Sequence, residues 1–431
     1  MFLSSGSAFF FMQLKQTATV SLSPILMVNF IGAMGFSIVL PFMAAIVLKF
    51  GGNALVYGTL GATYSFFQLI GSPVLGKWSD NMGRKKILLL CQAGTFFGWI
   101  IFLAGIIQPN HFIKLSGFLI SVPLILIFAG RSLDGITGGN ISVANAYLAD
   151  ITPKAERKKN FGRMAATANL GLIFGPLIAG ALGATGLGYK LPVMAAAFIS
   201  LVAMVVILYG LKELNPRPGK SDAPVASQNI APGLANPGRS TLISTLKLPY
   251  VSFFMLLYFL IFLAFNFFYV AFPVYVAGDL HWTVLQMGIF FSVLSGMLVV
   301  VQGPILSWLA KKVSSAILVI GGAVLLSAGF AFFRYPDVTM IYTGAVFFSA
   351  GNGVMWPSFM ALLSNTGDAD TQGVIQGFAG SAGSLASITG LITGGLLYHT
   401  MGANLFLFAT IFMLLIAVVS VRLIRIEKLI S

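Results

Sequence analysis

The sequence has very few charged residues. Only 8% of its 431 residues are Asp, Glu, Lys or Arg, whereas a soluble domain carries about 25%. So few charges cannot cover the water-facing surface of a chain in which 58% of the residues are hydrophobic. This composition excludes a soluble globular protein, and the apolar content excludes a disordered chain.

Cysteine and histidine are scarce as well. Cys91 is the single cysteine, so no intramolecular disulfide can form, and His111, His281 and His399 show no metal-ligand spacing. No nucleophile, base and orienting residue converge in the sequence, and no glycine-rich phosphate loop with its lysine is present. We therefore predict no metal, no cofactor, no enzymatic activity and no ATP-driven transport by this chain alone.

The sequence is rich in long apolar runs. A helix that crosses the hydrocarbon layer of a membrane needs about 20 such residues. Twelve runs of this kind predict twelve transmembrane helices, near 22–48, 54–76, 86–107, 117–149, 164–186 and 191–211 in the first half and near 250–276, 284–309, 314–333, 338–362, 373–398 and 402–423 in the second.

The positive charges follow these runs. Most of the 25 Lys and Arg residues fall in tails and loops that alternate to one side of the membrane, and the positive-inside rule places that side, with both termini, in the cytoplasm. The net charge of +14 therefore reflects orientation in the lipid bilayer. A nucleic-acid partner is not expected, because it would need basic residues interleaved with a stacking surface on one soluble face.

A proline-rich segment divides the chain. Residues 212–248 contain five prolines among Gly, Ser and Asn, which is typical of a flexible linker. The sequence thus predicts a cytoplasmic N-terminal tail (1–21), a six-helix bundle (22–211), a cytoplasmic linker (212–248), a second six-helix bundle (249–424) and a cytoplasmic C-terminal tail (425–431).

The two predicted bundles resemble each other. The segment around Pro73 recurs around Pro304, and the segment around Gly175 recurs around Gly390. The predicted fold is therefore an all-α membrane protein with twelve transmembrane helices in two six-helix bundles related by a parallel internal repeat. Such a repeat is typical of transporters, with a substrate site between the halves near the membrane midplane. Because twelve helices can form a complete pathway, a monomer is expected.

A glycine-rich loop follows the second predicted helix. Residues 76–86 resemble the signature that the major facilitator superfamily carries between helices 2 and 3, departing from it at Asn81. The resemblance implies a conformational latch in which Asp80 faces the positive N-terminal end of the helix predicted at 373–398. The alternative is a solvated turn whose cations only fix orientation. The expected latch residues are Gly76, Asp80, Gly83, Arg84 and Lys85.

The fourth predicted helix carries an arginine and an acid. Arg131, Gly135 and Gly139 share one helical face and resemble the superfamily's helix-4 motif. An arginine inside the membrane costs about 2.5–3.5 kcal/mol and needs a partner or a watery cavity. Asp134 is the only deeply placed acid in the sequence, so we expect Arg131 and Asp134 to couple transport to protons. The alternative is a local ion pair that only holds the helix in register.

The fifth predicted helix contains Gly171, Gly175, Pro176 and Gly180, which resemble the Gly-Pro motif of the superfamily's antiporters. Such a cluster weakens the helix and gives it a smooth face, so that the halves can rock against each other; a passive kink is the alternative. Residues 135–152 resemble most closely the drug/proton antiporters of the tetracycline-exporter type. The carboxylate that many of these carry in helix 1 has no counterpart in residues 29–41.

The second bundle contains no predicted intramembrane charge but many aromatic residues. They could line a cavity for a hydrophobic or cationic ligand, or they could simply pack against lipid and protein. The expected substrate-binding residues are Asn266, Tyr269, Asn352 and Trp356, followed by Gln68 and Gln302.

The predicted function is secondary active transport of a small molecule. A proton-coupled exporter of amphipathic drug-like compounds in a bacterial inner membrane is expected from the resemblance. An importer of a nutrient, amino acid or siderophore on the same fold is the alternative. A membrane-bound enzyme or receptor is disfavoured, because neither accounts for the repeated halves.

Overall fold

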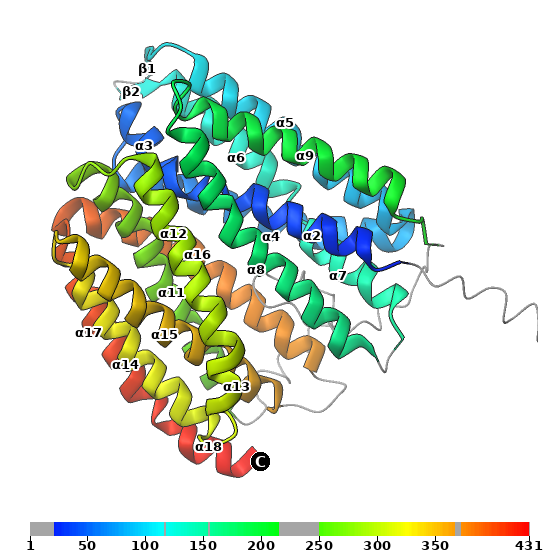
Figure 1. Cartoon of the computed structure of the whole chain (residues 1–431), viewed down its shortest axis with the longest axis vertical. Helices are drawn as coiled ribbons and strands as arrows, with labels where there is room; N and C mark the ends of the chain where they lie inside the picture. Colours follow the sequence, from blue (N-terminus) through cyan, green and yellow to red (C-terminus); the bar gives the residue numbers. More distant parts are fainter. Residues whose placement is uncertain (1–20, 116–117, 154–155, 215–249, 367–371, 431) are drawn as a thin grey trace, which may run out of the picture.

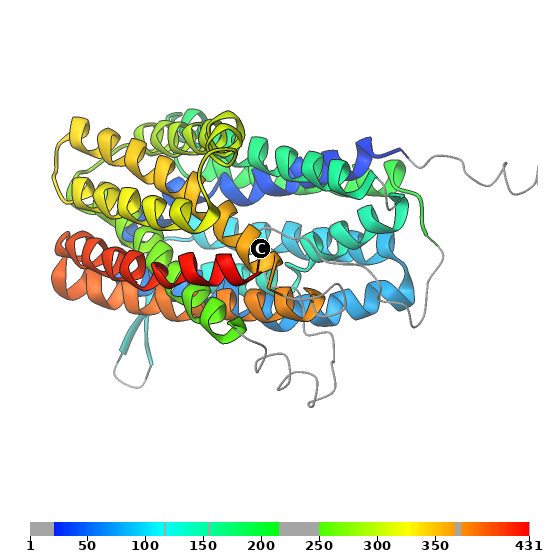
Figure 2. The same cartoon turned by 90° about the horizontal axis from the view of Figure 1, so that it is seen from below.

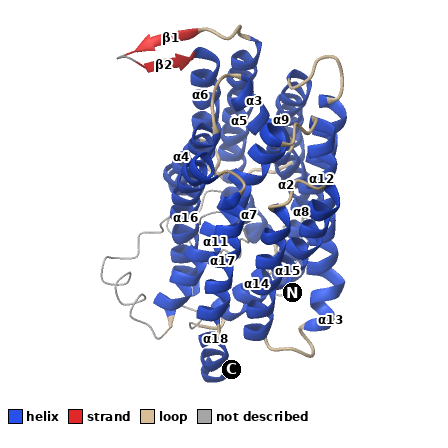
Figure 3. Ribbon diagram, turned by 90° about the vertical axis from the view of Figure 1, so that its left-hand side faces the viewer, coloured by secondary structure: helices blue, strands red, loops and turns tan. Residues whose placement is uncertain are grey.

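The computed structural model describes residues 21–115, 118–153, 156–214, 250–366 and 372–430. The predicted N-terminal tail and nearly all of the predicted linker lie outside these residues. Helices make up nearly the whole of the described chain (Figures 1 and 3). The first half contains α2 (Ser23–Ser37), α3 (Leu40–Lys49), α4 (Ala54–Met82), α5 (Arg84–Ile107), β1 (Phe112–Leu115), β2 (Phe118–Ser121), α6 (Val122–Ile136), α7 (Asn140–Ile151), α8 (Arg157–Gly183) and α9 (Lys190–Gly210).

The second half is built in the same way. Two short stretches in it, η2 and η3, are π-helical. The elements are α11 (Val251–Val274), η2 (Tyr275–Asp279), α12 (Val284–Val300), η3 (Val301–Ile305), α13 (Leu306–Leu309), α14 (Ser315–Phe333), α15 (Val338–Ser364), α16 (Gln372–Met401), α17 (Asn404–Ser420) and α18 (Arg422–Ile430).

Ten helical stretches of the described chain are long and apolar enough to cross a membrane. The α4 helix is longer than most of them but more polar, and α6 and α7 are separated by a break that leaves each too short to count alone. With α4 and the α6–α7 pair, these stretches account for the twelve predicted runs. The protein is therefore a multi-pass integral membrane protein with an all-helical membrane fold.

The first and fourth predicted runs are each interrupted in the structure. Pro41 lies in the first turn of α3 and has no N–H to donate to the preceding turn, which ends α2 at Ser37. In the fourth run, Gly138 and Gly139 separate α6 from α7, because glycine costs about 1 kcal/mol relative to alanine inside a helix.

The predicted start of the fourth helix at residue 117 is wrong. Residues Phe118–Ser121 form strand β2, which pairs antiparallel with β1 so that Phe112 lies opposite Ser121. The helix begins only at Val122, with Pro123 in the first turn, where the missing N–H costs nothing. An apolar strand and an apolar helix have the same hydropathy, so the run of hydrophobic residues hid the boundary. The hairpin projects beyond the helices at one end of the molecule (Figure 3).

In each half, an acidic side chain from the last segment accepts hydrogen bonds at the start of the third membrane-crossing helix. Glu213, which follows α9, accepts a hydrogen bond from the backbone N–H of Lys85 at the start of α5 (3.2 Å). Glu427 in α18 accepts from the N–H groups of Ser315 and Ala316 at the start of α14 (2.9 and 3.1 Å). An anion at a helix N-terminus satisfies free N–H groups and favours the helix dipole. The matching positions reflect the internal repeat.

The predicted C-terminal tail is largely helical. The α18 helix packs on the second half, with Leu423 and Ile426 buried. The residues are too few to span a membrane, which is why hydropathy alone assigned them to a tail.

Glycines set the distance between neighbouring helices in both halves. A Cβ atom at Gly98 of α5 would lie 2.9 Å from the carbonyl oxygen of Gly130 in α6, and one at Gly351 of α15 would lie 2.6 Å from that of Gly322 in α14. These are the third and fourth crossings of each half, so the same close packing recurs.

The halves diverge along the molecule. The hairpin end carries β1 and β2, whereas the linker end is the opposite one, where α4 ends at Met82 and α9 at Gly210. Figure 1 shows the helices of the first half (blue to green) and the second half (yellow-green to red) meeting toward the hairpin end and spreading away from it. Figure 2 shows the same helices from below, with the yellow and red helices of the second half on the left and helices of the first half extending to the right.

Candidate functional site

Arg131 and Asp134 form an ion pair within α6. Their side chains lie three residues apart, with 2.8 Å between Arg131 Nη1 and Asp134 Oδ2. Arg131 is 4% exposed and Asp134 7%. Among the residues that the structure describes, no other charged side chain is buried. Within the described residues, this pair is thus the buried charged site of the membrane-crossing helices.

Aromatic and amide groups surround the arginine. The guanidinium carbon of Arg131 lies 4.3 Å from the ring centre of Tyr64 in α4 and 5.8 Å from that of Trp99 in α5, so the charge also rests on two aromatic faces. Gln68 donates to the Tyr64 hydroxyl and to the carbonyl oxygen of Gly138, both at 3.2 Å. Three helices therefore contribute to the pair's surroundings.

Two hydrogen-bond donors in this cluster lack an acceptor among the described residues. They are Nε of Arg131 and the indole Nε1 of Trp99, and both residues are buried. Leaving such donors unpaired is costly, so a buried acceptor from a ligand or from water would be favoured beside them. The two donors are thus the hydrogen-bonding capacity of this cluster that the described residues do not use.

The close approach of α4, α5 and α6 depends on small residues. A Cβ atom at Gly98 would lie 3.2 Å from that of Asp134, and one at Gly135 would lie 2.6 Å from the carbonyl oxygen of Tyr64. Larger residues would push α5 and α4 away from α6 and open the surroundings of the pair. These glycines position Trp99 and Tyr64.

In the second half, Asn266 and Trp356 are both buried, and Trp356 belongs to an aromatic cluster. Asn266 is 7% exposed and donates to the carbonyl of Phe262 (2.7 Å) and to Ser387 Oγ (3.4 Å), which joins α11 to α16. Trp356 lies edge-on to Tyr258 and Phe262, with ring centres 5.1 Å apart in each case. Its indole N–H has no acceptor among the described residues.

The other expected substrate residues are more exposed or lie elsewhere. Tyr269 is 44% exposed, and its carbonyl oxygen accepts from the hydroxyl of Tyr57 across the halves (3.4 Å). Asn352 and Gln302 are half-buried, in α15 and η3. Gln68 belongs to the surroundings of Arg131. The six expected residues thus divide between the two halves and do not form one contacting group.

The Gly-Pro motif of the fifth predicted helix lies in α8 and faces two neighbouring helices. Cβ atoms at Gly171 and Gly175 would lie 2.6 and 2.8 Å from backbone carbonyl oxygens of α2 in the same half. One at Gly180 would lie 3.2 Å from the Cα of Gly288 in α12, which belongs to the other half, and the carbonyl of Pro176 faces the same glycine. The motif therefore has one part that holds α2 and one part that lies on the seam between the halves.

A second seam, between α4 and α16, is equally tight at the hairpin end. A Cβ at Gly58 would overlap the carbonyl oxygen of Leu391, and one at Gly395 would lie 2.6 Å from that of Ala54. Further along the same two helices, Cβ atoms at Gly76 and Gly377 would meet nothing within 4 Å.

The seam between α8 and α12 is likewise tight at one end only, because Cβ atoms at Gly162 and Gly296, nearer the linker end, would meet nothing within 4 Å. The halves are closed together at the hairpin end and apart at the linker end.

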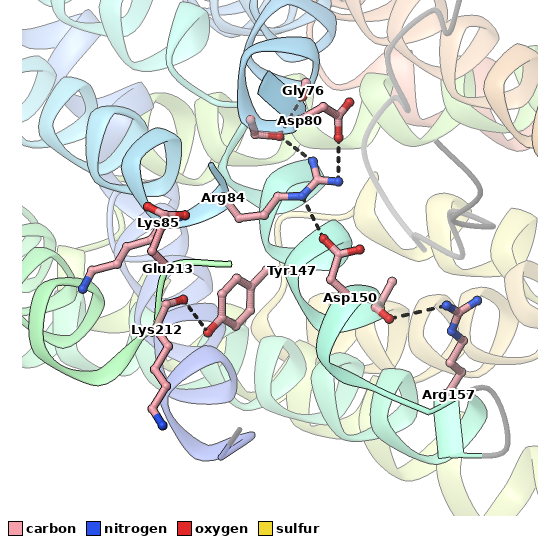
Figure 4. A network of polar contacts seen from close by, with 11 residues as sticks. Gly76, Asp80, Arg84, Lys85, Tyr147, Asp150, Arg157, Lys212 and Glu213 are labelled. Atoms are coloured by element: carbon pink, nitrogen blue, oxygen red, sulfur yellow. Dashed lines mark hydrogen bonds and ion pairs between the residues drawn. The ribbon is translucent and has the colours of Figure 1, made fainter. Parts of the chain in front are cut away.

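A polar network organises the linker end of the first half (Figure 4). Arg84 reaches Asp80 Oδ1 through Nη2 (2.6 Å) and Asp150 Oδ2 through Nε (3.1 Å), and it donates to Ser79 Oγ (2.6 Å). The network joins α4, α5 and α7. In this arrangement the described partner of Asp80 is Arg84, and the residues just before α16 lie outside the described chain. A contact of Asp80 with that helix stays a prediction.

The two remaining latch residues shape the turn between α4 and α5. Gly83 has φ of 104°, a left-handed conformation that glycine adopts freely, and a Cβ there would overlap the Glu213 carboxylate. The Lys85 ammonium donates to the carbonyl of Leu208 (2.7 Å), and Tyr147 donates to that of Lys212 (3.1 Å). The first bond joins the turn to the end of α9, and the second joins α7 to the start of the linker.

Sequence reasoning missed four residues of these sites. Tyr64 and Trp99 come from helices other than that of Arg131, and one sequence does not show which helical faces meet. Asp150 and Glu213 are not deeply placed in the sequence, in contrast to Asp134, and their clearest signal was their position at the ends of helices beside basic residues.

The structure has two repeated bundles of membrane-crossing helices that are closed together at one end. The first bundle contains a buried ion pair. Together these features define a transporter. The chain belongs to the Major Facilitator Superfamily, whose family model matches residues 25–391, with a further match over 254–429. The protein is accordingly a secondary transporter of small molecules and not an enzyme.

Several relatives are similar to the chain over part or most of its length. The tetracycline resistance protein, class C, of Escherichia coli is 26% identical over 367 residues, which cover 83% of this chain and 84% of that protein. The class E protein of Escherichia coli is 36% identical over 193 residues, 44% of this chain and 43% of the relative. The hippocampus abundant transcript 1 protein of Homo sapiens is 28% identical over 350 residues, 79% of this chain and 63% of that protein.

Solved structures share the fold at low sequence identity. The human organic anion transporter MFSD10 (TETRAN) has a TM-score of 0.64 at 18% identity, covering 93% of this chain and 98% of the other. The nucleoside transporter NupG has a TM-score of 0.72 at 10% identity, with 93% and 99% covered. The D-xylose-proton symporter has a TM-score of 0.71 at 14% identity, with 93% and 96% covered.

Proposed function

We propose that this protein is a proton-coupled exporter of amphipathic, drug-like compounds in a bacterial inner membrane, working as a monomer by alternating access. The observation that carries the proposal is the buried pair of Arg131 and Asp134. The relatives named as tetracycline resistance proteins support the direction and the class of substrate. Tetracycline is therefore the first compound to test.

Asp134 is the group that we assign to proton binding. Its carboxyl group can be neutralised by a proton, whereas an arginine keeps its charge in proteins. When Asp134 is charged, it compensates Arg131, and when it is neutral, Arg131 must find another partner. Protonation therefore changes the electrostatics of the contact region between α4, α5 and α6. Such a change can bias the two arrangements of the halves.

The described state suits the loading step of an exporter. The halves are closed at the hairpin end and apart at the linker end. If the linker end is cytoplasmic, as the distribution of Lys and Arg predicts, a substrate enters from the cytoplasm. Closing the linker end and opening the other would release it outside. Rocking takes place at the two seams, where glycines of α8 and α12 and of α4 and α16 face each other.

The latch residues are proposed to act at the linker end. In the described state, Arg84 holds Asp80 and Asp150 within the first half. When the linker ends approach each other, Asp80 would become available to the N-terminus of α16, where a negative charge is favourable.

The substrate site is proposed to lie between the polar cluster of the first half and the aromatic cluster of the second. Aromatic faces there suit a planar or cationic ligand, and the free N–H of Trp356 suits an acceptor. Asn266, Asn352, Tyr269, Gln68 and Gln302 are the further candidates.

Inverted membrane vesicles with an acidified lumen and a pH-sensitive dye test the proposal. A panel of tetracycline, lipophilic cations and amino acids is added to vesicles with wild type, Asp134→Asn or Asp337→Asn. Tetracycline or another drug should discharge the gradient in wild type and in Asp337→Asn but not in Asp134→Asn. Asp337 is the matched control because it is exposed and caps α15, and asparagine caps a helix as well as aspartate.

Each variant must be present in the membrane and monodisperse after extraction. If Asp134→Asn fails this check, the neutral pair Arg131→Gln/Asp134→Asn replaces it. Unchanged proton release in Asp134→Asn would refute Asp134 as the coupling group. If no drug on the panel moves protons through folded wild type, the exporter is refuted, and uptake of nutrients, amino acids and siderophores then tests the importer.

A further inference from the structure

The surface of the second half at the linker end is strongly basic. The α18 helix lies there with one apolar face buried, since Leu423 and Ile426 are 0% and 1% exposed. Its three cations, Arg422, Arg425 and Lys428, are all exposed, and the Arg422 guanidinium also lies 5.0 Å from the ring centre of Phe253. The helix is thus amphipathic, and Arg425 and Lys428 lie on the face turned away from Leu423 and Ile426. It forms the end of the molecule opposite the hairpin in Figure 3.

The one acid of α18 does not reduce this charge at the surface. Glu427 is half-buried and bonds to the backbone N–H groups of Ser315 and Ala316 at 2.9 and 3.1 Å. This contact also brings α18 next to the turn that precedes α14. That turn carries two further exposed cations, Lys311 and Lys312.

The neighbouring side chains place these cations at the membrane surface. Trp308 is 57% exposed, and the Lys312 ammonium lies 4.3 Å from its ring centre. Tryptophan and lysine at the ends of membrane helices are typical of the headgroup layer. Val418 and Val421, next to α18, are 68% and 52% exposed, as expected for side chains that face lipid tails.

We propose that Lys311, Lys312, Arg425 and Lys428 form a binding site for the phosphate groups of anionic phospholipids, such as phosphatidylglycerol. The area combines four exposed cations, an aromatic anchor and an adjoining apolar surface, which match a negatively charged headgroup and its acyl chains. Charge-assisted hydrogen bonds from lysine and arginine to phosphate are among the strong ones. Basic residues beside a membrane helix attract anionic lipid.

A general orienting role for these cations would not require preferential lipid binding. Counting the lipids bound to the purified protein distinguishes preferential lipid binding from a general orienting role. Full-length protein in detergent is titrated with equal mixtures of phosphatidylglycerol and phosphatidylcholine, and the bound lipids are counted by native mass spectrometry. Wild type should retain phosphatidylglycerol preferentially, and the variant Lys311→Ala/Lys312→Ala/Arg425→Ala/Lys428→Ala should lose that preference by roughly tenfold or more.

The matched control removes four exposed cations from the linker end of the first half, as Lys77→Ala/Lys86→Ala/Lys159→Ala/Arg163→Ala. It should keep the preference of wild type. Equal loss in both variants, or wild type that binds both lipids alike, would overturn the proposal. If the first variant aggregates, the preference of wild type for phosphatidylglycerol is measured at rising salt concentration. Binding through these cations must weaken as the ionic strength rises, so an unchanged preference would overturn the proposal.

Discussion

The charge of Arg131 is balanced by neighbours from three helices. Asp134 supplies the opposite charge on the same helix, and Tyr64 and Trp99 place aromatic rings against the guanidinium. The spacing of Arg131 and Asp134 was enough to predict that these two could pair. The rings could not be predicted, because they depend on which faces of α4 and α5 meet α6.

The pair should behave as one unit when it is mutated. Asp134→Asn leaves a buried arginine uncompensated and should cost about 3–5 kcal/mol of stability, whereas Arg131→Gln should cost less because Asp134 can take up a proton. The double variant should be more stable than the sum of the single losses implies. The temperature at which half of the purified protein remains monodisperse measures this. Strictly additive losses would contradict the pairing.

At the scale of helices, the apolar runs predicted nearly all the membrane-crossing elements, but hydropathy did not show where a helix breaks. Pro41 interrupts the first run and Gly138 the fourth, and β2 takes the start of that same fourth run. The short α18 looked like a tail because its amphipathic pattern is shorter than a membrane helix. Contacts between helices depend on glycines whose neighbours only the structure shows.

Replacing one such glycine should have an effect that depends on its neighbours. Gly98→Ala puts a methyl group 2.9 Å from the carbonyl oxygen of Gly130 and should destabilise the protein by about 1–3 kcal/mol. Gly296→Ala has open space and should be neutral or stabilising by up to about 1 kcal/mol, from helix propensity. Thermal stability in detergent compares the two. A Gly98→Ala protein as stable as Gly296→Ala would show that α5 and α6 do not pack as described.

At the scale of the whole molecule, the internal repeat and the two bundles were predictable, and the structure adds the state of the seams. Gly58 and Gly395 meet the other half at the hairpin end, whereas Gly76 and Gly377 face open space at the linker end. A sequence is common to every state of a transporter, so it could not indicate which end is closed. Distances between the two halves, measured at the hairpin end and at the linker end, report directly which end is closed.

Distances between spin labels test the central claim, that protonation of Asp134 controls the rocking of the halves. In a Cys91→Ala background, one pair of labels at Lys159→Cys and Ala361→Cys reports the linker end, and another at Leu187→Cys and Tyr335→Cys reports the hairpin end; all four positions are exposed. A change of pH across the proton uptake of Asp134 should shift the two distances in opposite directions in wild type and leave both unchanged in Asp134→Asn. Distances that change together, or a variant that responds to pH as wild type does, would contradict the account.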